Sequence, residues 1–156
     1  MNRWRVAVLL ALGLPGSGGG LAAQGSPFTA RRTTRGTVAV GETVHDSLTR
    51  RDVVLPAEST YAQQWRLRGR AGQTVTIDLA SLAFDAYAFL LGPGFEGAPP
   101  QDDDSGGHCN ARISVRLPRT ADYVIVVTSR EPFATGRFTL SVTAGPKRPA
   151  LAPCTR

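Results

Sequence analysis

The chain has 156 residues and a formal net charge of +6 at pH 7, and 42% of its residues are hydrophobic. This length allows one domain with a modest core. Almost all of the positive charge is arginine, and Lys147 is the only lysine. The skew indicates either selection for anion binding or a GC-rich genome that favours arginine codons. The charge therefore does not make nucleic acid a partner, and we expect none.

The first residues have the order of segments found in secretory signal peptides. A basic start at Met1–Arg5 precedes an apolar run at Val6–Leu14, and small residues follow up to Ala23. This order predicts a signal peptide over residues 1–23, cut after Ala23, in a secreted or periplasmic protein. The alternative is an uncleaved anchor or a buried helix, although the run is short for a membrane span. We expect no span downstream, and cleavage leaves 133 residues with a charge of +4.

Residues 24–36 are polar and rich in Arg and Thr, and we expect a flexible lead there. From residue 37 to residue 144, short apolar runs with a period of two are separated by Gly, Pro and Asp. The clearest are Trp65–Leu67, Val75–Leu79, Ile113–Leu117 and Phe138–Val142, and Tyr123–Thr128 is a nearly continuous apolar run. Half-buried strands show this pattern, and a series of them without helices predicts an all-β fold, an antiparallel β-sandwich over residues 37–144.

The segment between Leu79 and Leu91 fits two patterns. Its apolar spacing and its alanines permit a helix. Tyr87, Phe89 and Leu91, however, fit a strand that ends at Gly92. We predict a turn or short helical loop over Ser81–Phe84, followed by that strand.

Two cysteines, Cys109 and Cys154, lie in the mature chain. In an oxidising compartment an even count favours a disulfide, which would tie the Pro-rich tail (145–156) to the region beside the Asp-rich loop. Closing so long a loop stabilises by roughly 3–4 kcal/mol in the chain-entropy model. Without the bridge, the tail is expected to be disordered.

Five stretches, taken in chain order, resemble the bacterial pre-peptidase C-terminal domain family. They are Trp65–Ile77, Phe84–Tyr87, Asn110–Ile113, Leu117–Tyr123 and Gly136–Val142, with the Asp-rich loop Gln101–Gly107 after the second. The resemblance covers residues 37–142 and implies a jelly-roll-like β-sandwich, usually appended to secreted proteases; related collagen-binding modules bind calcium. The chain departs from the pattern as a free-standing version without a protease domain. It also has Asp122 where a Gly commonly precedes the Tyr.

The Asp-rich loop carries candidate metal ligands. Calcium takes several oxygen ligands, and the carboxylates of Asp102, Asp103 and Asp104 can converge on one ion only where the backbone turns. The family resemblance places Asp85 near this loop. These four aspartates form the predicted calcium site, and the alternative is a solvated acidic loop in which one Asp caps a turn.

The histidines do not complete a catalytic or zinc site in the sequence. His108 lies beside Cys109, but adjacent residues rarely bind one ion, and further ligands are missing. Nucleophilic catalysis needs a Ser or Cys with a histidine base and an orienting acid, and no Gly-x-Ser-x-Gly element occurs. His45 is isolated. We therefore expect no catalytic residues and no enzyme activity.

Arg66, Arg68 and Arg70 are spaced to lie on one face of a strand, opposite a buried Trp65 and Leu67. Such a stripe is a candidate site for acidic polysaccharide or phosphate head groups, and the alternative is an ordinary solvated face that protects a sheet edge.

These observations together predict a monomeric, secreted, non-catalytic module that binds extracellular or envelope protein or polysaccharide and is stabilised by calcium. The alternative is an export or maturation partner of a separately encoded secreted enzyme. A cryptic hydrolase is the third class.

Overall fold

The computed structural model describes residues 34–155, so the predicted signal peptide and residues 24–33 of the predicted lead lie outside the described residues. Within that range every regular element is a β-strand. In chain order they are β1 (Gly36–Thr37), β2 (Thr43–Leu48), β3 (Val53–Leu55), β4 (Thr60–Gly69), β5 (Thr74–Ala80), β6 (Ala86–Leu91), β7 (Gln101–Asp102), β8 (Ala111–Arg116), β9 (Ala121–Ser129) and β10 (Gly136–Ala144). No helix in this part of the chain is long and apolar enough to cross a membrane.

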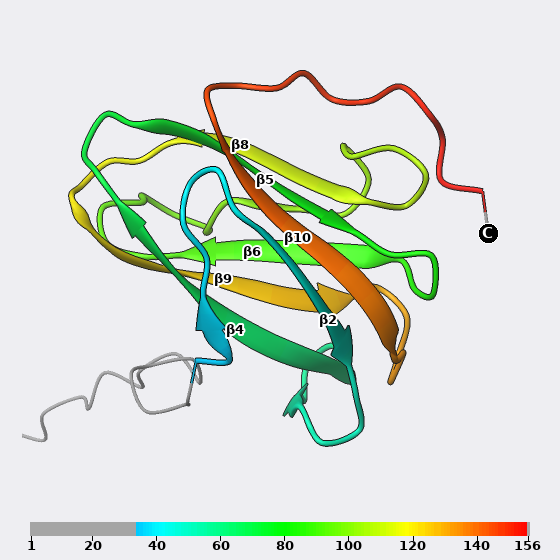
Figure 1. Cartoon of the computed structure of the whole chain (residues 1–156). Helices are drawn as coiled ribbons and strands as arrows, with labels where there is room; N and C mark the ends of the chain where they lie inside the picture. The colour runs from blue at the N-terminus through cyan, green and yellow to red at the C-terminus, as the bar shows by residue number, and fades with distance from the viewer. Residues whose placement is uncertain (1–33, 156) are drawn as a thin grey trace, which may run out of the picture. The chain divides into compact units, whose positions relative to one another are not determined.

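The strands form two sheets that pack face to face (Figure 1). The first sheet has the order β1-β4-β9-β6-β7, with β3 also paired to β4, and the second has the order β2-β10-β5-β8. The pairing of β1 with β4 is parallel, and the other strand pairs are antiparallel. The predicted all-β sandwich is confirmed, and the Leu79–Leu91 segment forms two strands joined by a loop rather than a helix.

The core lies between the sheets and follows the period-two pattern of the sequence. Alternate residues of the long strands point inward and are fully buried, among them Leu67, Ile77, Leu90, Ile125 and Leu140. Trp65 is also buried, at 7% exposure, as expected. Because successive residues of a strand point to opposite faces, the residues between them form the two outer faces of the sandwich.

Tyr123 fixes the turns at one end of the core. Its ring is fully buried, and a Cβ placed on Gly69 or Gly92 would lie within 3.0 Å of that ring. The Tyr123 hydroxyl donates to the carbonyl oxygen of Arg119 (2.7 Å) and accepts from the Arg119 amide (3.1 Å). The turn between β8 and β9 thus supplies the hydrogen-bond partners of the buried Tyr123 hydroxyl, and these hydrogen bonds also fix the turn.

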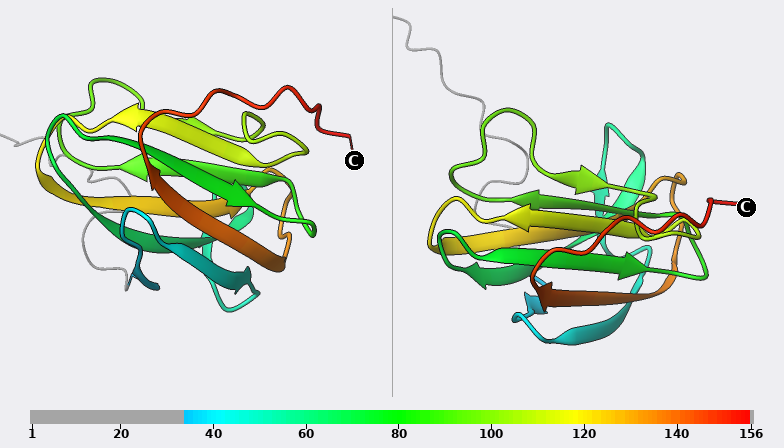
Figure 2. Two further views of the ribbon diagram at one scale, coloured as in Figure 1. Left: turned by 45° about the horizontal axis from the view of Figure 1, so that its top comes forward. Right: turned by 90° about the horizontal axis from the view of Figure 1, so that it is seen from above.

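The tail after β10 crosses the outer face of β5 and β8 (Figure 2). The Thr76 hydroxyl donates to the carbonyl of Gly145 (2.8 Å), and the Lys147 amide donates to the Ser114 hydroxyl (3.3 Å). Thr76 is fully buried in consequence, although it points away from the core.

A disulfide joins the far part of the tail to the sandwich. Cys154 is bonded to Cys109, so the predicted bridge is confirmed. Between the crossing and the bridge, the Ala150 amide donates to the carbonyl of Ser105 (2.8 Å), and the His108 amide donates to the carbonyl of Ala152 (3.2 Å). The tail is therefore attached along its length, from Gly145 to Cys154.

Candidate functional site

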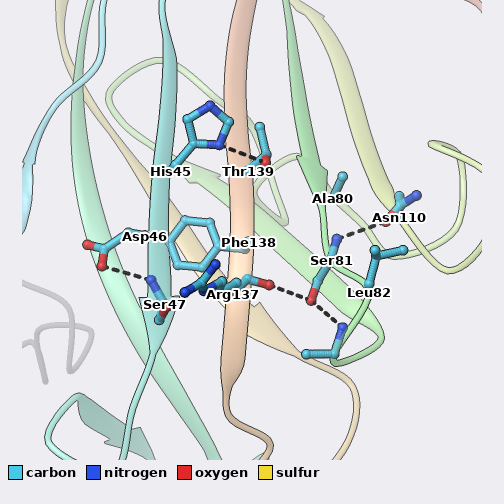
Figure 3. A pocket seen from close by; sticks show the side chains of 11 residues that line it. His45, Asp46, Ser47, Ala80, Ser81, Leu82, Asn110, Arg137, Phe138 and Thr139 are labelled. Atoms are coloured by element: carbon cyan, nitrogen blue, oxygen red, sulfur yellow. Dashed lines mark hydrogen bonds between the residues drawn. The ribbon is translucent and has the colours of Figure 1, made fainter.

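The tail covers only half of the outer face of the second sheet, and the other half carries an open groove. The groove has a volume of ≈ 930 Å³ and lies over β2 and β10, bounded by the loop between β5 and β6 (Figure 3). Its lining residues are His45, Asp46, Ser47, Ala80, Ser81, Leu82, Ala83, Asn110, Arg137, Phe138 and Thr139.

The floor of the groove is polar because outward-facing residues of β2 and β10 alternate with core residues. The two strands pair with His45 opposite Thr139 and Ser47 opposite Arg137. The His45 ring nitrogen Nδ1 lies 3.1 Å from the Thr139 hydroxyl oxygen, and the pair is exposed. Arg137 is exposed, and no ion pair joins it to a carboxylate of residues 34–155. The floor thus offers hydroxyl, imidazole and guanidinium groups to a partner.

Ser81 fixes the wall of the groove. Its hydroxyl donates to the carbonyl of Arg137 (2.8 Å) and accepts from the amides of Ala83 (3.0 Å) and Phe84 (3.2 Å). Its amide donates to Asn110 Oδ1 (3.0 Å). The loop is further anchored by the buried Phe84 ring. These contacts hold the loop against the start of β10.

Leu82 lies in that loop and is fully exposed, with a relative accessibility of 103%. Its neighbours Ser81 and Phe84 are buried, so the backbone that carries Leu82 is fixed while its side chain contacts solvent. An exposed leucine needs no explanation on its own. On a loop whose backbone is fixed at the edge of this groove, however, it is an apolar anchor that needs no ordering of the loop backbone on binding.

An ion pair joins Asp46 of β2 to Arg35, the residue before β1. Arg35 donates to Asp46 through Nε (2.7 Å) and Nη2 (3.2 Å), and the Ser47 amide donates to Asp46 Oδ1 (2.7 Å). The Arg35 hydrogen bond holds the pKa of the Asp46 carboxyl below its ordinary value. The same bond raises the pKa of Arg35.

Among residues 34–155, the structure does not bring three of the aspartates that the sequence predicts as calcium ligands within 4.8 Å of one another. The Asp102 carboxylate accepts from the Ser105 amide (2.8 Å), the Ser105 hydroxyl (2.6 Å) and the Arg112 amide (2.8 Å). Asp103 forms an ion pair with Arg130 at 3.0 Å. Asp104 is exposed. Asp102 therefore acts as the cap of the loop.

Asp85 lies against the disulfide. Across residues 34–155, the group of three potential ligands within 4.8 Å of one another is Asp85, Cys109 and Cys154. Its two cysteines are oxidised to a disulfide and have no thiolate to offer a metal. The donors as placed do not fit a calcium cage, and calcium binding stays a prediction from the sequence.

The predicted arginine stripe is divided by the end of β4. Arg66 and Arg68 share the outer face of β4, and Arg68 pairs with Asp122 at 3.1 Å in an exposed ion pair. Arg70 lies beyond Gly69, in the turn to β5. The three side chains therefore do not form one row on a strand.

Comparisons with known proteins agree with the sandwich fold. No protein-family model matches the chain, and no curated protein matches it. The chain is similar in structure to PliG of Aeromonas hydrophila, a periplasmic inhibitor of g-type lysozyme. The two are 19% identical, the match covers 70% of this chain and 96% of that one, and the TM-score is 0.50.

Two further solved structures resemble the chain. One is the pre-peptidase C-terminal domain of a Bacillus anthracis collagenase, from the family that the sequence motifs resemble, with 13% identity, 73% and 100% coverage of the two chains and a TM-score of 0.49. The other is PliG of Salmonella Typhimurium, with 17% identity, 72% and 100% coverage and a TM-score of 0.44. At these identities the likeness to the Aeromonas structure establishes a shared β-sandwich fold.

Proposed function

We propose that this chain is a non-catalytic binding module that recognises a folded protein through the groove over β2 and β10. The observation that carries the proposal is an uncovered groove, whose floor presents hydroxyl, imidazole and guanidinium groups, next to a fully exposed Leu82 on a fixed loop. Protein interfaces combine a few apolar anchors with a polar surround, and an anchor on a fixed backbone avoids the entropy cost of ordering a loop on binding.

Two observations support an extracytoplasmic protein as the partner. The Cys109–Cys154 disulfide is of the kind that persists in oxidising compartments. The Aeromonas protein that shares the fold is an inhibitor of a lysozyme and thus binds a protein. A g-type lysozyme is accordingly the first partner to test, and a separately encoded secreted enzyme that needs help in export or maturation is the second.

The experiment compares two exposed leucines. A photo-crosslinking residue is placed at Leu82 or at Leu151, which is 97% exposed and lies in the tail. Each oxidised protein is illuminated with purified g-type lysozyme, and in a second series with the secreted proteins of the source bacterium. We expect a discrete adduct from position 82, suppressed by excess unmodified protein, and none from position 151.

Equal labelling from both positions, or no competed adduct from position 82 in either series, would contradict the proposal. An adduct with lysozyme is followed by a cell-wall lysis assay with Leu82→Asp and the control Leu151→Asp. We expect the first substitution to weaken binding at least tenfold and the second to leave it unchanged, because a buried apolar anchor is worth about 2 kcal/mol or more.

A further inference from the structure

The end of the sandwich away from the Leu82 loop carries arginines that the proposed groove does not use. Arg70 lies in the turn between β4 and β5, Arg116 ends β8, and Arg119 lies in the turn between β8 and β9. All three are exposed. No ion pair joins any of them to a carboxylate of residues 34–155. We call these three residues the arginine patch.

Backbone contacts bring the two turns of the arginine patch together (Figure 1). The Gly72 amide donates to the carbonyl of Leu117, and the Leu117 amide donates to the carbonyl of Gln73, both at 2.8 Å. The Ala71 amide donates to the Thr120 hydroxyl at 2.9 Å. Two turns distant in sequence are thus fixed side by side, and each carries an exposed arginine.

Two of the three guanidinium groups, those of Arg116 and Arg119, lie near glycines of adjacent loops. A Cβ placed on Gly72 would lie 3.4 Å from Arg116 Nη2, and one on Gly94 would lie 3.0 Å from Arg119 Nε. The Arg119 backbone is clamped by the buried Tyr123 hydroxyl. Exposed cations on adjacent turns that form no ion pair create a positive surface potential, which attracts anions.

We propose that the arginine patch binds an acidic polysaccharide, a chain bearing carboxylate or sulfate groups. Guanidinium groups form two parallel hydrogen bonds with such groups, and several arginines on adjacent turns can engage successive charges along one chain. The exposed large apolar residues of the described chain are Val54, Leu82, Phe133 and Leu151. None of these lies in the two turns of the patch.

The lack of large exposed apolar residues in the patch favours a polysaccharide over other anionic partners. A lipid surface is usually bound through apolar side chains that enter the membrane beside the cations. Single-stranded nucleic acid is usually bound through aromatic rings on which bases stack. The arginine patch presents cations without either feature, so a flexible hydrophilic polyanion fits it best.

The test measures binding of the mature, oxidised protein to dextran sulfate and to polygalacturonate, with neutral dextran as the control polymer. The variant Arg116→Ala/Arg119→Ala is compared with Arg50→Ala/Arg51→Ala, which removes two exposed arginines from the loop between β2 and β3. Both variants change the net charge equally. We expect at least a tenfold weaker Kd from the first and less than a twofold change from the second.

Binding should also weaken as salt is raised from 50 to 200 mM, because counter-ions are released from the polymer. Circular dichroism checks the fold of each variant, and Arg116→Lys/Arg119→Lys, which keeps the charges, should lose less affinity than the alanine pair. Equal losses from the two alanine pairs would reduce the effect to net charge and overturn the proposal. So would the absence of binding to both polyanions, or equally tight binding to phosphatidylglycerol vesicles. The groove proposal is untouched by these outcomes, since Leu82 lies at the other end of the sandwich.

Discussion

The Lys147 ammonium lies 2.6 Å from the Asp78 carboxylate and so fastens the tail to the outer face of β5. Asp78 also pairs with Arg112 of the neighbouring β8. Only 20% of the Asp78 side chain is exposed, so one partly buried carboxylate holds two cations from different elements.

Asp78→Asn should destabilise the protein by about 1–2 kcal/mol, because it leaves the partly buried Arg112 and the exposed Lys147 without their anion. Hydrogen exchange at the Lys147 and Ala150 amides should accelerate. Asp122→Asn is the control, since Asp122 pairs with Arg68 in an exposed bridge that should be worth less than about 1 kcal/mol. Equal losses of unfolding free energy in the two variants would contradict this role of Asp78.

Replacing both cysteines, Cys109→Ser with Cys154→Ser, should cost about 3–4 kcal/mol, because the bridge closes a loop with a sequence separation of 45 residues. Urea denaturation measures the loss, and reduction of the unmodified protein should reproduce it. The tail should then exchange its amide hydrogens rapidly as far back as Ala150. A loss below about 1 kcal/mol would show that the tail contacts hold without the bridge.

Gly136→Ala should destabilise by about 1–3 kcal/mol and disturb the groove wall, because the added Cβ would lie 2.3 Å from the Ala83 Cβ. The Gly136 φ of +145° adds backbone strain for any other residue. The double variant Gly136→Ala/Ala83→Gly removes the clash but keeps the strain. We expect it to recover part of the lost unfolding free energy in a double-mutant cycle. No recovery would assign the whole cost to the backbone.

The free energy of unfolding should fall in acid because the Asp46 carboxylate becomes protonated. Its pKa is lowered in the folded protein by the Arg35 hydrogen bond. The stabilisation is therefore fully present above the pKa of the unfolded chain, about 3.9, and is lost as pH falls through the lower folded value. Asp46→Asn should flatten the pH profile of the unfolding free energy in this range. Because Arg35 is half-exposed, the effect should be modest and should shrink at high salt. An unchanged acid profile in Asp46→Asn would contradict this assignment.

Asp102→Ala should cost about 2–4 kcal/mol in the presence of chelator, since it removes an acceptor of three hydrogen bonds to the loop. Asp104→Ala is the control and should be nearly neutral, because Asp104 is exposed. The calcium prediction is checked in the same melts. A cation site requires a Tm increase with calcium that Asp85→Asn and Asp103→Asn abolish, and an unchanged Tm in the unmodified protein would contradict it.

The long strands were predictable because their periodicity is strong. Alternation in β5 and β10 and the apolar run in β9 are clear in the sequence, and β4, β6 and β8 lie where predicted. The short strands β1, β3 and β7 contain two or three residues, too few to show a period. They form because backbone groups beside β4 and β6 find partners there, which is a tertiary effect.

The candidate site was much less predictable. The sequence of an Asp-rich loop shows that carboxylate oxygens are present, but not which backbone amides lie next to them. It therefore could not tell whether Asp102 binds a metal ion or accepts hydrogen bonds from its own loop. The groove had only a weak signal, the alternation of His45 and Ser47 on one strand and Arg137 and Thr139 on another. The sequence does not show that these two strands are neighbours in the sheet.

The pairing of His45 with Thr139 has a consequence for folding. The two residues are 94 positions apart, and the groove floor exists only after both ends of the domain have met. Contacts so distant in sequence form slowly, typically on a scale of milliseconds to seconds. A partner that reads this floor therefore binds only chains whose folding is complete. Such a partner would stabilise the native state and not the folding intermediates. Protection of the module from proteolysis would then increase with the concentration of the partner.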